Sequence, residues 1–326
     1  MRLKRKTFVK LFGAAALGGA TDYPTQGAAK IDRKALVGRH KIVLTKHDPL
    51  TPLTVGNGEF GFTADLTGLQ TFPQAHQGDM LLQTMAQWSL HETPDSHNYK
   101  LSDTFNNYDS HGRSVPYPSG DEAGGGFGDG SPAAQWLNRN PHRFDLGRIS
   151  LALPQSGDQA PKIEELPDTR QELNLWTGFL TSEFHVGGQP VSVETVAHPR
   201  LNLLAVRITS PLVTSGQRGV KLHFPYASSD WRQASDWGHP DSHTTVTTPG
   251  ALDTAEVTFV RQLDGTTKYT AQAMASKGAS FTTLGKHEYQ WKATGQPVLT
   301  FVIAFFPEGS KTEPGSLPGF EQVRRA

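Results

Sequence analysis

The sequence contains no cysteine, which excludes disulfide bridges, thiolate metal sites, cysteine nucleophiles and a lipid anchor on cysteine. It also has no net charge, because 31 lysines and arginines balance 31 aspartates and glutamates. Without a basic surplus, nucleic acid and anionic membrane surfaces are poor partners. No apolar run approaches the roughly 20 residues that a helix needs to span a bilayer. We therefore expect neither a nucleic-acid partner nor a membrane span.

The first twenty residues have the pattern of an export signal. The basic stretch Lys4–Lys10 resembles the twin-arginine export motif, with Lys6 in place of its second arginine. A mildly apolar run follows over Leu11–Ala20 and ends in small residues that suit signal peptidase. We expect a signal peptide over residues 1–20, a linker over 21–38, and a periplasmic or secreted protein. The export route, twin-arginine or Sec, stays open, and a basic tail is the alternative interpretation.

Most of the chain has the pattern of β-strands. Apolar residues alternate over residues 171–186 and 191–196, with glycine turns between them, which predicts a meander of three strands. Continuous apolar runs at 203–208 and 298–306 predict strands buried on both faces. No useful helical period occurs before residue 320. The pattern predicts an all-β chain, a large antiparallel two-sheet β-sandwich whose core comes from the inward faces of residues 149–208 and 298–306.

One segment is more specific than the rest. Gly56–Gly58 predicts a turn, because Gly-Asn-Gly tolerates positive φ, and Phe60–Ala64 alternates as a half-buried strand does. The chain should turn again at Asp65–Gly68 and run back through Leu69–Phe72. By this pattern the segment is a β-hairpin.

The hairpin sequence GNGEFGFTADLTGLQTF resembles the opening of the N-terminal β-sandwich of six-hairpin glycosidase-like proteins. The meander sequence, QELNLWTGFLTSEF with VSVET after a glycine turn, is similar to sandwich strands of glycoside phosphorylases and α-fucosidase-type enzymes of that clan. The resemblance implies a super-sandwich over residues 39–307. It also implies that residues 308–326 are a linker and the start of an (α/α)6 barrel, a partner domain that carries the general acid and base. A natural C-terminal tail is the alternative for residues 308–326.

A long segment, residues 92–145, interrupts the β pattern and is rich in Asn, Asp, His, Gly and Pro. It predicts a long irregular loop insertion, and loops of this length in a compact domain are usually functional or disordered. Aromatic side chains gather there with Arg, Asn and His, the mixture that binds sugars by stacking and hydrogen bonding. The predicted carbohydrate-binding residues are Gln87, Trp88, His91, Tyr117, Asn140, His142 and Arg143.

Within this set, the aromatic, His and Arg side chains are expected together at one end of the sandwich, facing the barrel or its substrate. Core packing of the tryptophans is the alternative interpretation. A shorter loop ranks second as a binding segment. It contains Trp231, Asp236, Trp237, His239 and His243.

No catalytic residue, metal site or cofactor is predicted within the chain. The insertion offers carboxylates for glycoside hydrolysis, but spacing in a loop does not fix the separation that a catalytic pair needs. These carboxylates are Glu92, Asp95, Asp103 and Asp109. The histidine pairs His91/His97 and His239/His243 lack a helix that would place two ligands on one face.

Three classes of function remain open. The leading one is the non-catalytic N-terminal sandwich of an exported carbohydrate-active enzyme, which braces the barrel and lends loop residues to its sugar cleft; this chain alone would then be inactive. The second is a stand-alone carbohydrate-binding module. The third, an aldose-mutarotase-like enzyme, works with a histidine and a glutamate on a large sandwich, and no matching motif stands out here.

Overall fold

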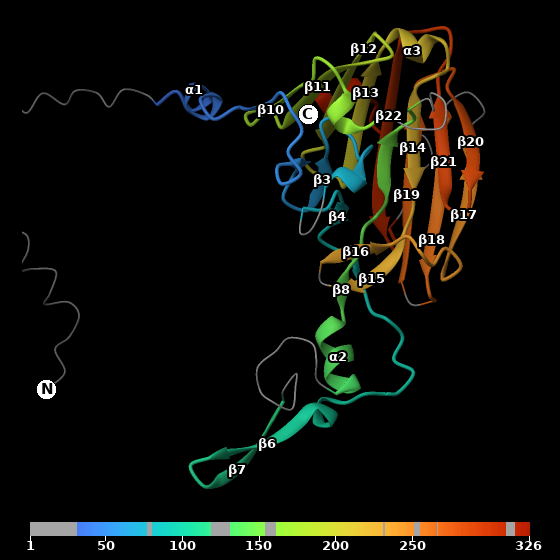
Figure 1. Ribbon diagram of the computed structural model, residues 1–326. Coiled ribbons are helices and arrows are strands. Elements are labelled where there is room, and N and C mark those ends of the chain that lie inside the picture. Colours follow the sequence, from blue (N-terminus) through green and yellow to red (C-terminus); the bar gives the residue numbers. More distant parts are fainter. Residues whose placement is uncertain are drawn as a thin grey trace, which may run out of the picture.

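The computed structural model describes residues 31–76, 80–118, 131–153, 161–230, 232–250, 255–265, 267–310 and 317–326. The predicted signal peptide over residues 1–20 lies outside these ranges, as does most of the predicted linker over 21–38. Figure 1 shows a body of long strands, from which one segment projects at the end that carries β8 and β15.

The strands are β1 (Ile42–Leu44), β2 (Leu53–Gly56), β3 (Phe60–Ala64), β4 (Thr84–Ala86), β5 (Leu90–His91), β6 (Phe105–Ser110), β7 (Arg113–Pro118), β8 (His142–Arg143), β9 (Arg148–Leu151), β10 (Arg170–Asn174), β11 (Phe179–Val186), β12 (Gln189–Ala197), β13 (Leu203–Thr209), β14 (Gly219–His223), β15 (Tyr226–Asp230), β16 (Gln233–Asp236), β17 (His243–Pro249), β18 (Val257–Leu263), β19 (Thr267–Ala275), β20 (Ser280–Gly285), β21 (Glu288–Lys292) and β22 (Val298–Pro307). The helices are α1 (Arg33–Gly38), α2 (Pro132–Arg139), α3 (Pro211–Thr214) and α4 (Phe320–Arg325), with short 3-10 turns η1 (Pro73–Ala75), η2 (Leu101–Thr104) and η3 (Ile163–Glu165). Among the described residues, no helix is long and apolar enough to cross a membrane.

Two layers of antiparallel strands form the body. In the described residues one layer is a nine-stranded sheet, the large sheet, with the order β1-β10-β11-β12-β13-β22-β19-β18-β17. The other layer contains the small sheet, β20-β21-β14-β9, and a three-stranded sheet, β2-β3-β4. Phe60 of the three-stranded sheet stacks on Phe305 of the large sheet, with ring centroids 6.1 Å apart. The fold confirms the predicted all-β antiparallel sandwich, with its second layer divided into separate sheets.

Aromatic side chains fill the space between the large and small sheets. Trp291 of β21 is fully buried, with its ring centroid 5.0 Å from Phe301 and 6.0 Å from Phe259. Strands within 149–208 and 298–306 contribute inward-facing residues to this core, as predicted. β18, β19 and β21 contribute as well, so the core extends beyond those two ranges.

The predicted strands at the centre of the large sheet are confirmed. β10, β11 and β12 pair in succession as a meander, with Leu173 opposite Leu180. β13 then pairs with β22, with Val206 opposite Phe301, and both faces of β13 are buried from Leu203 to Val206. These strands tolerate apolar residues on both faces because each face is covered by another part of the chain.

Helix α4 covers the outer face of β13 and β22. Phe320 is buried there, and the Arg207 guanidinium lies 4.2 Å from the centroid of its ring. Arg207 also forms ion pairs with Glu194, at 3.0 Å, and with Glu321 of α4. The helix falls within 308–326, where the sequence predicts a linker and the first helix of a barrel.

The Gly-Asn-Gly turn joins β2 to β3, as the motif predicts. At Gly56 an added Cβ would lie 2.4 Å from the carbonyl oxygen of Phe60, so a larger residue does not fit. Gly58 has a φ of 93°, in the region that favours glycine. Asn57 Oδ1 accepts a hydrogen bond from the Phe60 N–H at 2.8 Å, and its Nδ2 donates to the His198 carbonyl at 2.9 Å. The motif therefore closes the hairpin and ties it to the β12–β13 turn.

The second half of the predicted hairpin is wrong, because residues 69–72 form no returning strand. The carboxylate of buried Asp65 accepts a hydrogen bond from the Phe72 N–H at 2.6 Å and holds the segment as a loop. Gln70 instead contacts β9: its N–H donates to the Ile149 carbonyl, and its side-chain oxygen accepts from the Ile149 N–H. β3 pairs with β4 on that side.

The predicted insertion is present, and part of it is regular. Within residues 92–145, strands β6 and β7 form a hairpin, and helix α2 packs against η2. Figure 1 shows that β6, β7 and α2 project from the end of the sandwich. Ser131 caps α2 and Pro132 opens it, so the helix has a start signal although it is only eight residues long.

Trp291 provides a test of the core. Replacing Trp291 with alanine should lower the free energy of unfolding by about 3–5 kcal/mol, because it leaves a cavity between the two sheets. Trp176, which is 49% exposed in the β10–β11 turn, is the matched control, and its replacement should change stability by less than about 0.5 kcal/mol. Urea unfolding of both variants measures this, and equal losses would contradict the described packing.

Candidate functional site

Four of the predicted binding residues lie together at the base of the insertion. β5 pairs with β8, which places His91 opposite His142, and their ring centroids are 5.2 Å apart. Arg143 Nη1 donates hydrogen bonds to the carbonyls of Ala86 at 3.0 Å and Gln87 at 2.9 Å. The indole of Trp88 packs partly buried on the main core. These contacts hold both ends of the insertion together.

His91 is buried in a polar cluster that joins the insertion to the sandwich. Its Nε2 lies 3.0 Å from Asp264 Oδ2, and its Nδ1 lies 2.9 Å from Thr267 Oγ1. The hydroxyl of Tyr226 donates to the same oxygen of Asp264 at 2.5 Å. Burial lowers the pKa of His91, and the nearby Asp264 carboxylate opposes that shift. With 1% of its surface exposed, His91 contributes to this internal connection and offers little surface to a ligand.

Of the other predicted binding residues, one supports this group through hydrogen bonds and the other two are exposed. Asn140 accepts a hydrogen bond from the Thr93 N–H and donates one to the Trp136 carbonyl, which ties α2 to the base of the insertion. Gln87 is exposed in the β4–β5 turn. Tyr117 is 63% exposed on β7, in the projecting hairpin, and Figure 1 places that hairpin well away from β8.

Three carboxylates of the insertion stabilise local turns. Asp95 accepts hydrogen bonds from two backbone N–H groups of its own loop. Asp103 accepts one from Lys100, and Asp109 accepts one from Gly112 in the β6–β7 turn. Each carboxylate therefore supports the backbone next to it.

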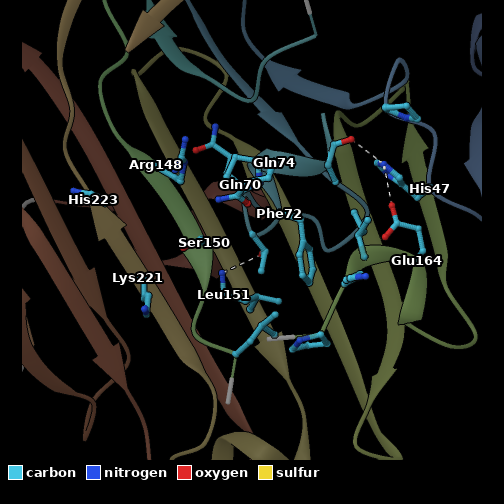
Figure 2. Close-up of a pocket in the computed structure, with 18 of the residues that line it drawn as sticks. His47, Gln70, Phe72, Gln74, Arg148, Ser150, Leu151, Glu164, Lys221 and His223 are labelled. Atoms are coloured by element: carbon cyan, nitrogen blue, oxygen red, sulfur yellow. Dashed lines mark hydrogen bonds and ion pairs between the residues drawn. The ribbon is translucent and has the colours of Figure 1, made fainter. Parts of the chain in front are cut away.

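A large pocket lies elsewhere, on the outer face of the small sheet. Its volume is about 1060 Å³, and Figure 2 shows the side chains that surround it. One wall comes from β9, β14 and β21, and the other from segments 47–50, 70–75 and 161–164. None of the seven predicted binding residues lines it.

Polar side chains cross the floor of this pocket in a row. On three neighbouring strands, Arg148 lies opposite His223, and His223 lies opposite Glu288. They face outward because the residues beside them in sequence point into the core, and side chains alternate along a strand. Lys221, two residues before His223, lies 3.4 Å from Glu288 Oε1.

The opposite part of the pocket is more apolar. Phe72, Leu151, Leu153 and Ile163 line it, and Figure 2 shows Phe72 and Leu151 in its middle. His47 bridges to the far wall, with its Nε2 3.8 Å from Glu164 and 3.1 Å from a backbone carbonyl. The pocket thus combines an apolar side with a row of hydrogen-bonding groups.

Burial changes the electrostatics of the row. Burial lowers the pKa of His223 to about 4, and the neighbouring positive charge of Arg148 adds to the shift while Glu288 opposes it. His223 is therefore a neutral imidazole at pH 7. The guanidinium of Arg148 lies 4.0 Å from the centroid of the Trp237 ring, and burial lowers its pKa. Its Nε is buried and has no hydrogen-bond partner.

A smaller pocket of about 320 Å³ adjoins the large one, and both are lined by Pro73, Gln74 and Arg148. Trp237 lines it and contacts the His223 ring, with centroids 4.7 Å apart. The second-ranked sequence segment therefore does reach the pocket region through Trp237. Of the remaining residues of that segment, Trp231 lies outside the described residues, and His239 is paired with Asp236 near the surface, at 2.6 Å.

The sequence contains a weak signal for these pocket residues. Each of the three strands carries charged or polar residues at alternate positions, which any strand with one solvent-facing side also does. Only the pairing of β9 with β14, and of β14 with β21, brings Arg148, Lys221, His223 and Glu288 together. The described residues contain no group of three or more His, Asp or Glu side chains arranged to hold a metal.

A second buried polar cluster lies near the His91 group. Arg261 is fully buried on β18 and donates to His243 Nδ1 at 2.6 Å and to the Pro225 carbonyl at 2.8 Å. The His243 ring stacks on His287, with centroids 3.9 Å apart. Burial lowers the pKa of His243 to about 2, and the positive charge of Arg261 adds to the shift. This cluster needs neutral histidines, because protonation would place like charges together.

No protein-family profile and no curated protein sequence matches the chain. Among solved structures, it is similar to a putative kojibiose phosphorylase from the human microbiome, with a TM-score of 0.47 and 12% identity over 87% of this chain and 34% of that one. It is also similar to a glycoside hydrolase of family 81 from Clostridium thermocellum, with a TM-score of 0.29 and 10% identity over 52% of this chain and 18% of that one. The chain spans about a third of the length of the phosphorylase and less than a fifth of the hydrolase.

The buried histidines predict how stability depends on pH. Above pH 6.5 His243 is neutral in both the folded and the unfolded chain. Below 6.5 the unfolded chain binds a proton that the folded chain rejects until about pH 2, so stability falls with falling pH. The slope of unfolding free energy against pH measures how many more protons the unfolded chain binds than the folded chain. Between pH 6 and 4.5, this number should be smaller by about one in His243→Asn than in the wild type. Urea unfolding at several pH values measures the slope.

His111→Asn is the control for this test, because it removes an exposed imidazole from the β6–β7 turn, outside the cluster. Subtracting the wild-type curve from each variant curve cancels the contribution of the buried carboxyl groups. If His243→Asn and His111→Asn have the same slope, the His243 cluster does not reject a proton on folding.

Proposed function

We propose that this chain is the β-sandwich part of an exported carbohydrate-active protein and that the pocket of Figure 2 binds a sugar unit of its substrate. In this proposal the chain itself is not catalytic, and a helical barrel that follows it carries the general acid and base. The sandwich then positions the substrate and braces the barrel. The insertion, with Tyr117 exposed on its hairpin, is available to contact that barrel.

The mixed lining of the pocket is the observation that carries this proposal. A pyranose ring has apolar C–H faces and an edge of hydroxyl groups, so it needs an apolar wall and a convergent set of donors and acceptors. Phe72 and Leu151 offer the apolar wall, and the row of Arg148, His223 and Glu288 offers the polar groups. A volume of about 1060 Å³ accommodates more than one sugar ring.

Two further observations support the finer parts of the proposal. The pattern of residues 1–20 supports export. The two carboxylates that line the pocket, Glu164 and Glu288, each lie within 4 Å of a basic side chain, at 3.8 Å and 3.4 Å. Glycoside hydrolysis instead requires a pair of carboxyl groups that flank the scissile bond, so this arrangement favours binding.

A second candidate function rests on one observation. His223 and Glu288 lie opposite each other in the pocket, which supplies the histidine and glutamate that an aldose-mutarotase-like enzyme needs. In this reaction His223, neutral at pH 7, takes a proton from the anomeric hydroxyl while solvent water gives a proton to the ring oxygen, which opens the ring. NMR of freshly dissolved α-glucose or α-galactose tests this: catalysed anomerisation by the chain, lost in His223→Gln, would favour it.

The pocket predicts which variants lose sugar binding. In calorimetric titrations with an oligosaccharide panel, Phe72→Ala and Glu288→Gln should each raise Kd about tenfold, because each removes roughly 1–2 kcal/mol of stacking or hydrogen bonding. Tyr117→Ala is the matched control for an exposed aromatic, and its Kd should equal that of the wild type. The purified chain should release no product from any glycoside that it binds.

Opposite results would separate the alternatives. Loss of binding in Tyr117→Ala, with the two pocket variants unaffected, would move the sugar site to the insertion. Turnover by the chain alone would show that the acid and base lie within it. The absence of binding to any sugar would reject the carbohydrate proposal.

A further inference from the structure

We propose that the pocket selects an acidic sugar, a uronate, and that Arg148 receives its carboxylate. This inference rests on the proposed function, because it names the class of sugar that the same pocket takes. It is carried by the state of Arg148, which is half-buried, held in place by packing on Trp237, and forms no hydrogen bond or ion pair with the described residues.

Arg148 is oriented by packing. Its guanidinium stacks on Trp237 at 4.0 Å, and Trp237 also contacts the ring of His223. Stacking occupies a face of the guanidinium and leaves its N–H groups directed along the plane, which is the orientation that binds a carboxylate with two parallel hydrogen bonds. The side chain has therefore already lost much of the rotational freedom that binding would otherwise cost.

The hydrogen-bonding capacity of Arg148 is unused. Its Nε is buried without a partner, and no carboxylate among the described residues forms an ion pair with it. Asp145 is the nearby carboxyl group that interacts with its charge, but the oxygens of Asp145 accept hydrogen bonds from Thr84, Gly147 and Ser235. The Nη1 and Nη2 groups of Arg148 are not among the buried unpartnered atoms, so a guanidinium that lines both pockets and has no protein partner can bind an anion through them.

The surroundings of Arg148 suit a sugar that carries this anion. Arg148 lies where the two pockets adjoin, and Gln74 lines both of them. Figure 2 shows Arg148 and Gln74 at the same end of the large pocket, with His223 and Lys221 along the adjoining wall. The amide of Gln74 and the hydroxyl of Ser150 can pair with ring hydroxyls while the guanidinium holds the carboxylate.

The other charges favour a carboxylate over a phosphate. Lys221 is already paired with Glu288, and His223 is neutral at pH 7, so neither adds a free positive charge. A phosphate dianion would meet one free guanidinium and the negative charges of Glu288 and Glu164. A uronate carries one charge, which matches Arg148, the cation of the floor row that has no carboxylate partner among the described residues, while Lys162 lies exposed at the rim. The hydroxyl groups of the sugar can use the carboxylates as acceptors.

Titration of the full chain with oligogalacturonate and oligoglucuronate, and with the methyl ester of each, tests the inference. The ester removes the charge and keeps the sugar, so the acid should bind about ten- to a hundredfold more tightly, the effect of a charge-assisted pair. Because this comparison uses the wild-type protein, it does not depend on a variant that folds. Raising the salt concentration from 50 to 500 mM should weaken binding of the acid and leave the affinity for the ester unchanged.

Two variants and one competitor complete the test. Arg148→Met keeps an apolar stem on Trp237 and should abolish the preference for the acid, while Arg148→Lys should restore only part of it. Lys162→Met removes an exposed lysine at the rim of the same pocket and should keep the preference. Inorganic phosphate at millimolar concentration should not displace the uronate.

The outcomes separate this inference from the proposed function. Equal affinity for acid and ester, or a preference for the acid that persists in Arg148→Met, would contradict the selection of a uronate by Arg148. Neither result would contradict sugar binding in the pocket. Displacement of the uronate by inorganic phosphate would show that Arg148 belongs to a general oxyanion site, which contradicts selection of a uronate. If neither acids, esters nor neutral sugars bind, the proposed function fails and the inference fails with it.

Discussion

Packing of the small sheet against the large sheet is the constraint on which the other features depend. One face of β21 and its neighbours is buried, because the ring of Trp291 packs there against Phe259 and Phe301. Because side chains alternate along a strand, this burial turns every second residue of β9, β14 and β21 outward. The row of Arg148, His223 and Glu288 is thus a consequence of core packing. A shift of one residue in the register of β14 would put His223 into the core and remove it from the pocket.

Buried polar clusters connect the parts that the apolar core does not reach. Asp264 joins His91, at the base of the insertion, to Tyr226 of β15, and Arg261 joins β18 to the start of β17 through His243. Such clusters are stable only when every member is paired and when the histidines stay neutral. Their stability therefore depends on pH, in a way that the apolar core does not share.

Asp65 shows how much a buried carboxyl group can organise. Its oxygens accept hydrogen bonds from Thr67 and from the Phe72 N–H, and they set the path of the loop that forms one wall of the pocket. Burial raises the pKa of Asp65 to about 6, although these hydrogen bonds oppose the shift. At pH 7 the carboxylate form therefore predominates and holds the loop beside Gln70 and β9.

The sequence alone determined the strands and the turn chemistry. The meander around Leu173 and Leu180, the doubly buried β13 and β22, and the Gly-Asn-Gly turn all follow from local periodicity and backbone preference. Tertiary structure decided which strands are neighbours, and with that the site. The aromatic and basic residues near β5 and β8 are prominent in sequence, yet Trp88 packs on the core and the Arg143 guanidinium bonds to carbonyls. The outward residues of β9, β14 and β21 are inconspicuous in sequence and become a pocket only through long-range pairing, because local patterns fix the face of a residue but not its neighbours across the sheet.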